Sequence, residues 1–281
     1  MKKQTLLFLA LLLYFTSFSQ ETKKANLFPS QNPSNFLFIN PDDLKIDSSF
    51  SYKKFGEKYI TGYNSFILEA IDKIQAKFPD GGGYFTGIKA IPAESPIGYD
   101  LHLLGKEIIK APRTTSYCSG ASYTAFIESL NILLADNTLT QTQHELMRMQ
   151  EPDGSRRNDG IKFWGIWNAD GYGSFDALVS YAEMGEKIKP ENAIPGDFMN
   201  ISWKSGIGHS VVFLGWLKIK DIPHVAYWSS QKSTNGLSLD IVKLERINNV
   251  SIVRLTKPEN IFQFIPKTEL THTQGDVIVF P

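Results

Sequence analysis

The sequence predicts an α+β domain in which helices from the first part of the chain pack on an antiparallel sheet formed by the last part. Apolar residues recur at helical spacing in several segments between Tyr63 and Ile188. After Ile188, short apolar runs alternate with turn residues as far as Thr256, as in a β-meander. At 281 residues with 42% hydrophobic content, the chain is large enough for one main core.

The first twenty residues have the layout of a secretory signal peptide. Lys2 and Lys3 precede an apolar stretch from Leu6 to Phe15, and small and polar residues follow as far as Gln20. The apolar stretch is too short for a comfortable membrane span, although an uncleaved N-terminal anchor is the alternative. Because Gln20 and Glu21 stand where a bacterial lipoprotein needs a cysteine, we expect a secreted or periplasmic protein without stable membrane insertion.

Charge and cysteine content narrow the functional classes further. Removing Lys2 and Lys3 from 29 basic residues leaves 27 against 29 acidic ones, a formal net charge of −2. A chain so close to neutrality is not expected to bind nucleic acid or an acidic membrane non-specifically. Cys118 is the only cysteine and cannot form an internal disulfide. In an oxidising compartment, a lone thiol is either buried or used chemically.

Residues 21–62, rich in Asn, Pro and Ser, are predicted to form an extended arm, and residues 63–281 a single α+β domain with its core at about 99–256. The run from Tyr63 to Phe78 is predicted to be an amphipathic helix. The glycines at 81–83 then end this helix. They are interpreted as a turn rather than a phosphate loop, because no Lys-Ser/Thr pair follows.

Three more helices are predicted, from Cys118 to Leu134, from Thr140 to Gln150 and from Ser174 to Ile188. A polar, aromatic segment precedes the last of them. Its aromatic side chains either line a binding cleft or anchor the segment to the core, and they are Trp164, Trp167 and Tyr172. The predicted strands are DFMNISW (197–203), GHSVVFLGW (208–216), HVAYWSS (224–230), GLSLDIV (236–242) and VSIVRLT (250–256).

Cys118 stands where a nucleophilic cysteine would be expected. At a helix start, the free N–H groups and the positive end of the helix dipole favour a thiolate by about 0.5–1 kcal/mol. The small side chains of Ser119 and Gly120 leave room for a substrate. The Cys118 N–H would then point toward a developing oxyanion.

A nucleophilic cysteine also needs a base, and His209 has the most suitable setting among the five histidines. It begins a very apolar strand after a glycine-rich loop and is backed by Val211 and Phe213 on the same face. The other four have no comparable setting; they are His102, His144, His224 and His272.

The segments YCSGASYTAFIESL and AIPGDFMNI…GIGHSVVFLGW together resemble the NlpC-type and CHAP cysteine peptidases and amidases of the papain-like superfamily. The resemblance covers about Tyr99 to Thr256. It implies a helix that carries the nucleophile and packs on an antiparallel sheet, cysteine attack on an amide, and substrates among bacterial cell-wall peptides. Cys118 matches the nucleophile position and His209 the general-base position.

This chain is longer between Cys118 and His209 than compact members of that family, which could reshape the cleft. The third catalytic residue is sought at the end of the next strand, because a hairpin about WLKIKDIP places residues 229–231 beside His209. Gln231 is predicted to orient the ring, since its amide oxygen can accept from the Nδ1–H; Ser229 and Ser230 are the alternatives. Tyr99 and Tyr117 are either packing residues or further oxyanion donors.

The predicted function is a secreted cysteine hydrolase that cleaves amide bonds in peptidoglycan stem peptides through a thiolate and an acyl-enzyme. It requires neither a metal nor an organic cofactor. One alternative is an acyltransferase on the same scaffold, which passes the acyl group to an amine or alcohol. Another is a non-catalytic module that binds cell-wall peptide or carbohydrate and whose thiol is inert.

Overall fold

The computed structural model describes residues 36–60, 62–87, 94–111, 113–149, 159, 161–168, 173–267 and 274–280. Its main feature is a six-stranded antiparallel sheet with the strand order β3-β8-β4-β5-β6-β7. The strands are β3 (Gly185–Ile188), β4 (Phe198–Trp203), β5 (Gly208–Ile219), β6 (Ile222–Gln231), β7 (Gly236–Lys243) and β8 (Ile247–Leu255). The predicted signal peptide lies outside the described residues.

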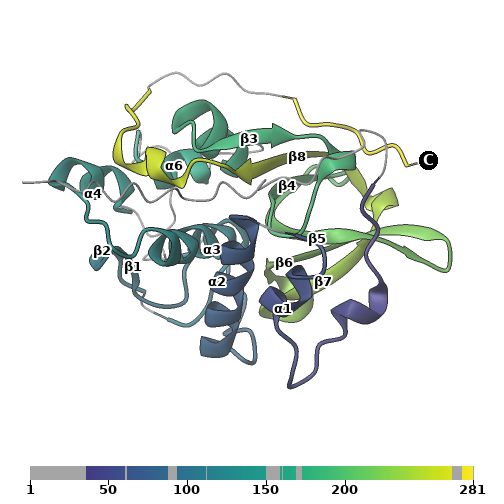
Figure 1. Cartoon of the computed structure of the whole chain (residues 1–281). Helices are drawn as coiled ribbons and strands as arrows, with labels where there is room; N and C mark the ends of the chain where they lie inside the picture. Colours follow the sequence, from purple (N-terminus) through teal and green to yellow (C-terminus); the bar gives the residue numbers. More distant parts are fainter. Residues whose placement is uncertain are drawn as a thin grey trace, which may run out of the picture.

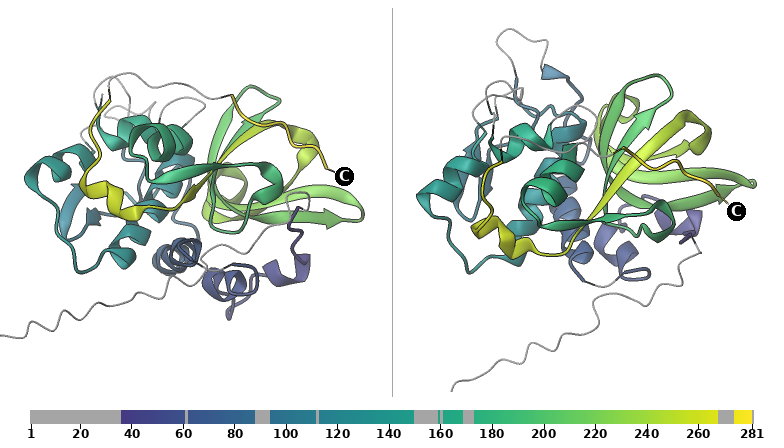
Figure 2. Two further views of the ribbon diagram at one scale, coloured as in Figure 1. Left: turned by 45° about the horizontal axis from the view of Figure 1, so that its top comes forward. Right: turned by 90° about the horizontal axis from the view of Figure 1, so that it is seen from above.

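Helices lie beside the sheet and form the other part of the molecule (Figures 1 and 2). They are α1 (Tyr52–Gly56), α2 (Asn64–Lys77), α3 (Cys118–Leu133), α4 (Gln141–Met147), α6 (Phe163–Trp167) and α7 (Gly173–Phe175), which continues as a π-helix over Asp176–Tyr181. α3 contacts α2 on one side and strands β5 and β6 on the other. No helix in the described part of the chain is both long and apolar enough to cross a bilayer.

The predicted combination of helices with an antiparallel sheet is confirmed, but the strand order departs from a simple meander. β4 to β7 follow one another as hairpin neighbours, whereas β8 returns to pair with β4. The prediction of a helix from Ser174 to Ile188 is wrong in its second half. Glu183 takes a left-handed backbone conformation with φ of 53°, which ends the helix, and β3 then pairs with β8.

Two smaller elements were not predicted. β1 (Leu101–Leu103) and β2 (Lys106–Ile109) form a hairpin whose turn residues, Leu104 and Gly105, both have positive φ. The part of the predicted arm at 36–60 is not extended throughout. It bridges Phe38 to Trp216 of β5 and then forms a 3₁₀ turn and α1.

The two faces of β5 belong to different parts of the core. Val212 and Leu214 face α3 within the larger apolar cluster, together with Phe126. Val211 and Phe213 face the opposite way, into a second cluster. Because side chains alternate along a strand, His209 lies on the same face as Val211 and Phe213. The ring therefore lies on the sheet face that is turned away from the body of α3.

A buried ion pair joins the start of β4 to the rest of the molecule. The Asp197 carboxylate is fully buried and accepts two hydrogen bonds from Arg254 of β8, from Nε at 2.8 Å and from Nη2 at 2.8 Å. It also accepts from Asn64 of α2 at 2.8 Å and from the Ile194 N–H at 2.9 Å. The four donors connect α2, β8 and the turn that leads into β4.

We predict that Arg254→Met lowers the free energy of unfolding by about 3–5 kcal/mol, because it leaves the Asp197 charge buried without its cation. Urea denaturation at pH 7 measures the change. Lys267→Met is the matched control, since its ion pair with Glu183 is exposed and its loss should cost less than about 1 kcal/mol. A change below about 1 kcal/mol in Arg254→Met would show that the pair is not a major source of stability.

Candidate active site

The candidate site lies at a seam where β5 and β6 separate. The two strands pair from Val212 and Trp228 toward their common turn, but not toward the other end. There, β5 stays paired with β4 as far as Gly208, and β6 stays paired with β7 as far as Gln231. The first residues of β5 and the last residues of β6 therefore face each other across a gap in the sheet.

α3 begins at this gap. The Ser230 hydroxyl donates to the carbonyl of Ser116, two residues before the helix, at 3.0 Å. On the β5 side, the hydroxyls of Ser122 and Ser210 lie 2.7 Å apart. Gly120 is required here, because a Cβ at this position would lie only 1.9 Å from the Pro96 carbonyl oxygen. The helix start is thus fixed to both strands.

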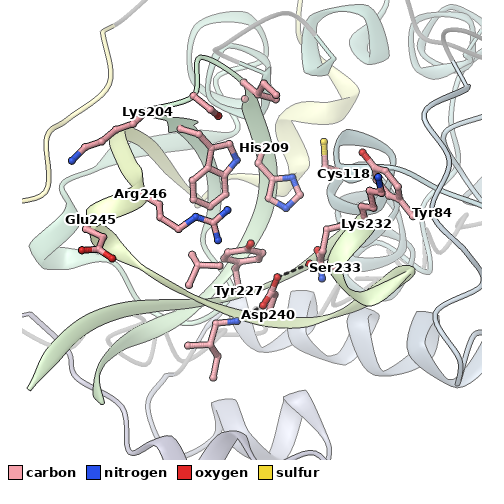
Figure 3. A pocket seen from close by; sticks show the side chains of 17 residues that line it. Tyr84, Cys118, Lys204, His209, Tyr227, Lys232, Ser233, Asp240, Glu245 and Arg246 are labelled. Atoms are coloured by element: carbon pink, nitrogen blue, oxygen red, sulfur yellow. Dashed lines mark hydrogen bonds between the residues drawn. The ribbon is translucent and has the colours of Figure 1, made fainter. Parts of the chain in front are cut away.

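Cys118 and His209 meet at this position and line the same two cavities, of about 730 and 800 Å³. Figure 3 shows the Cys118 sulfur at the start of α3 and the His209 ring on the neighbouring strand, at the same end of one cavity. The His209 ring packs between aromatic rings, with its centroid 6.2 Å from that of Trp203 and 5.4 Å from that of Tyr227. The structure therefore brings the two principal predicted residues together.

Gln231 lies opposite His209 across the seam. Both residues line the smaller cavity, and the two side chains interact. The Gln231 amide nitrogen donates to the Thr234 hydroxyl at 2.8 Å and to the Ser238 carbonyl at 3.2 Å, so its oxygen is the atom left for another donor. That oxygen and the His209 Nε2 are both buried without a hydrogen-bond partner in the described structure.

The position of Gln231 favours it over Ser229 and Ser230 as the residue that orients the His209 ring. Ser229 donates to the Ser210 carbonyl at 2.7 Å and Ser230 to Ser116, so both hydroxyls hold the backbone of the seam. The His209 atom buried without a partner is Nε2, whereas the sequence prediction gave the donor role to Nδ1. The interaction with Gln231 acts to raise the His209 pKa, against the larger effect of burial, but no hydrogen bond of normal length and angle joins the two side chains.

Burial determines the protonation states of the pair. It lowers the pKa of His209 to about 4, and the interaction with Gln231 offsets only part of this shift. Although part of the Cys118 side chain is exposed, burial raises the pKa of its thiol, against the opposing effect of backbone N–H groups of Ser210, Ser119 and Cys118 itself. The N–H groups at the helix start therefore lower the thiol pKa, as expected, but desolvation outweighs them and the net shift is upward.

At neutral pH the resting pair is a thiol beside a neutral imidazole. A neutral imidazole can accept the thiol proton while the sulfur attacks a carbonyl, so an ion pair need not form beforehand. The arrangement thus suits general-base catalysis of thiol addition.

Tyr84 is a site residue that the sequence analysis missed. It lines the smaller cavity, and Figure 3 shows it near the Cys118 sulfur. A bridge between Tyr84 and Ser116 places it there, after the glycines at 81–83, which all have positive φ. The glycine turn was identified from the sequence, but the position of the residue after it, Tyr84, beside the start of α3 depends on the tertiary fold.

The remaining aromatic candidates belong to the core. The Tyr99 hydroxyl donates to Glu128 at 2.6 Å and lines neither cavity, and Tyr117 is buried next to the helix start. Trp164 and Trp167 are fully buried and anchor their segment to the core, while Trp167 also borders the larger cavity, so both interpretations apply to Trp167. Tyr172 and His272 lie outside the described residues.

Comparison with known proteins identified no relative, since no family model, no curated protein and no solved structure matches this chain. The chemistry of the site is therefore inferred from its own geometry.

We predict that His209 makes the protein less stable in acid. Its folded-state pKa of about 4 lies below its ordinary value, so the unfolded chain binds the proton more readily. The contribution of neutral His209 to the free energy of unfolding is therefore fully present above about pH 6.5 and is lost as the pH falls toward 4. Between pH 7 and 4.5, wild type should lose about 2–2.5 kcal/mol more than His209→Gln in urea denaturation. Equal losses in both proteins would contradict the lowered pKa.

Proposed function

We propose that this protein is a cysteine hydrolase, exported from the cell, that cleaves amide bonds in peptidoglycan stem peptides. The observation that supports this best is the meeting of Cys118, His209 and Gln231 at one seam between two open cavities. The likeness of the two sequence segments to NlpC-type and CHAP enzymes suggests the bond and the substrate. The export of the protein rests on the signal-like first twenty residues.

In the proposed reaction, the Cys118 sulfur attacks the amide carbonyl while His209 accepts the thiol proton. Collapse of the tetrahedral intermediate breaks the C–N bond, and the imidazolium returns the proton to the leaving amine. His209 then takes a proton from water, which attacks the thioester and releases the carboxylic acid and the thiol. Gln231 holds the ring and accepts from its other N–H when the ring is protonated.

The two cavities support a substrate that extends on both sides of the scissile bond. Both are open, and they share Cys118 and His209 together with the turn between β4 and β5. An extended peptide lying from one cavity to the other would pass the sulfur. A binding site on both sides of the bond holds the carbonyl near the nucleophile, which is a major source of catalysis.

We predict that wild type releases peptide fragments from purified sacculi and from synthetic stem peptides, and that Cys118→Ala and His209→Gln release none above background. Mass spectrometry identifies the products. His224→Gln is the matched control, because His224 lies near the other end of β6 and its ring bonds only the Ile222 carbonyl. The hydrolase proposal fails for these substrates if wild type yields no fragment that depends on Cys118.

We predict that Gln231→Ala lowers kcat/KM by about tenfold to hundredfold, as expected for a residue that orients a catalytic group. Since the interaction with Gln231 raises the His209 pKa, its loss should also move the acid limb of kcat/KM to lower pH. Ser229→Ala is the control: it removes a structural hydrogen bond from the same strand and should leave the acid limb in place. An unchanged acid limb in Gln231→Ala would contradict this role.

A binding module with an inert thiol is the second candidate, and the raised pKa of Cys118 favours it. In that case the two cavities hold a ligand and no bond is broken. Peptide binding that survives in Cys118→Ala, together with an absence of Cys118-dependent products, would establish this alternative.

A further inference from the structure

The two cavities that meet at Cys118 and His209 differ in charge. The smaller is named here the basic cavity. Among the described residues it contains all the charged side chains that line either cavity, and they are Lys204, Lys232, Arg246, Asp240 and Glu245. The larger, named here the amide cavity, is lined instead by carboxamides, at Asn168, Asn200, Asn248 and Asn249. Since both cavities share the catalytic pair, the difference distinguishes the two sides of the scissile bond.

The basic cavity has three cationic side chains and two carboxylates, and its cations are not ion-paired with these carboxylates in the described structure. Asp240 accepts from the Ser233 hydroxyl at 2.8 Å and from the Ile241 N–H at 2.8 Å. The Glu245 Oε1 lies 3.6 Å from the Nζ of Lys243, a residue that does not line the cavity. Figure 3 shows Arg246 and Lys232 on opposite sides of His209, with the Lys204 side chain extending away from both. None of these three cations forms an ion pair with a carboxylate in the described part of the chain, and the Arg246 guanidinium instead lies over the Trp203 ring at 5.3 Å.

The amide cavity contains a donor that lacks an acceptor. Asn200 is only 9% exposed, and its amide nitrogen is buried without a hydrogen-bond partner within the described structure. Its oxygen accepts from the Ser174 hydroxyl at 3.4 Å. An unpaired buried donor destabilises the protein, and an oxygen of a bound group would remove that cost. A carboxylate is a poor candidate, because no cation among the residues that the structure describes lines this cavity to offset its desolvation.

We propose that the amide cavity binds an uncharged polar residue of the substrate and the basic cavity binds an acidic one. The scissile amide would then lie between a residue with a carbonyl or hydroxyl oxygen on one side and a carboxylate on the other. Asn200 would donate to the uncharged residue, and Lys232 and Arg246 would hold the carboxylate. This substrate class rests on the proposed hydrolase function, but binding to the two cavities is measurable without cleavage.

Four peptide sequences of the form acetyl-Ala-X-Y-Ala-amide, with X and Y each Gln or Glu, test this substrate preference. Each sequence is made in two versions, with both X and Y as L-residues or both as D-residues, and the four sequences are compared within each version. Their dissociation constants are measured by calorimetry on Cys118→Ala, which cannot cleave them. One of the two mixed peptides should bind about tenfold more tightly than its reversed sequence and than the Glu-Glu peptide. Cleavage by wild type should follow the same order.

Substitutions in each cavity then assign the preference. Lys232→Gln and Arg246→Gln should each weaken binding of the preferred mixed peptide about threefold to tenfold and leave the Gln-Gln peptide unchanged. Lys220→Gln, at the far end of the β5–β6 hairpin, is the matched control and should change neither. Asn248→Lys adds a cation to the exposed rim of the amide cavity and should raise the affinity for Glu-Glu.

The outcomes separate this proposal from the hydrolase function. If all four peptides bind within twofold of one another, or if Glu-Glu binds best to the unaltered cavities, the proposed substrate class is wrong even where Cys118-dependent cleavage occurs. If the mixed peptide is preferred but wild type cleaves nothing, the cavities are as proposed and the hydrolase function is wrong.

Discussion

The buried pair of Asp197 and Arg254 is the interaction on which the geometry of the site depends most. Asp197 immediately precedes β4, and β4 lies between β8 and β5 in the sheet. By accepting from Arg254 of β8, from Asn64 of α2 and from the turn before the strand, the carboxylate fixes the direction in which β4 starts. β5 pairs along β4, with Ile201 opposite His209, so the location of the ring follows from this anchor. Such a pair stabilises the fold only because every oxygen is bonded.

The seam between β5 and β6 explains how a histidine on one sheet face meets a cysteine on a helix that packs against the other face. While two strands remain paired, side chains on opposite faces cannot meet. Here the pairing stops at Val212 and Trp228, and α3 begins in the opening, fixed by Ser116 and Ser122. The residues around the opening also desolvate both the thiol and the imidazole. Proximity and the unfavourable shifts of both pKa values therefore have one structural cause.

Most patterns of local origin were predictable from the sequence, although the β1–β2 hairpin was missed, and features that depend on distant contacts were not. Helical spacing identified α2 and α3, alternation identified β4 to β8, and the hairpin about Lys220 led to Gln231. The β3 strand was missed because its partner, β8, is more than sixty residues away in sequence. Tyr84 reaches the site through a bridge to Ser116, and the raised thiol pKa comes from burial by residues that no local pattern specifies.

A neutral resting pair changes what the substrate must contribute under the proposed function. In a preformed thiolate–imidazolium pair the nucleophile is ready before binding, whereas here the proton moves only as the sulfur approaches a carbonyl. The rate then depends on how closely the carbonyl is held, since position within the groove replaces a lowered pKa as the source of reactivity. Under the same proposal, the basic and amide cavities would hold different groups on the two sides of the bond, and so would fix both the position of the carbonyl and the direction of the chain. Binding of the correct substrate would then also be the step that activates the Cys118 thiol.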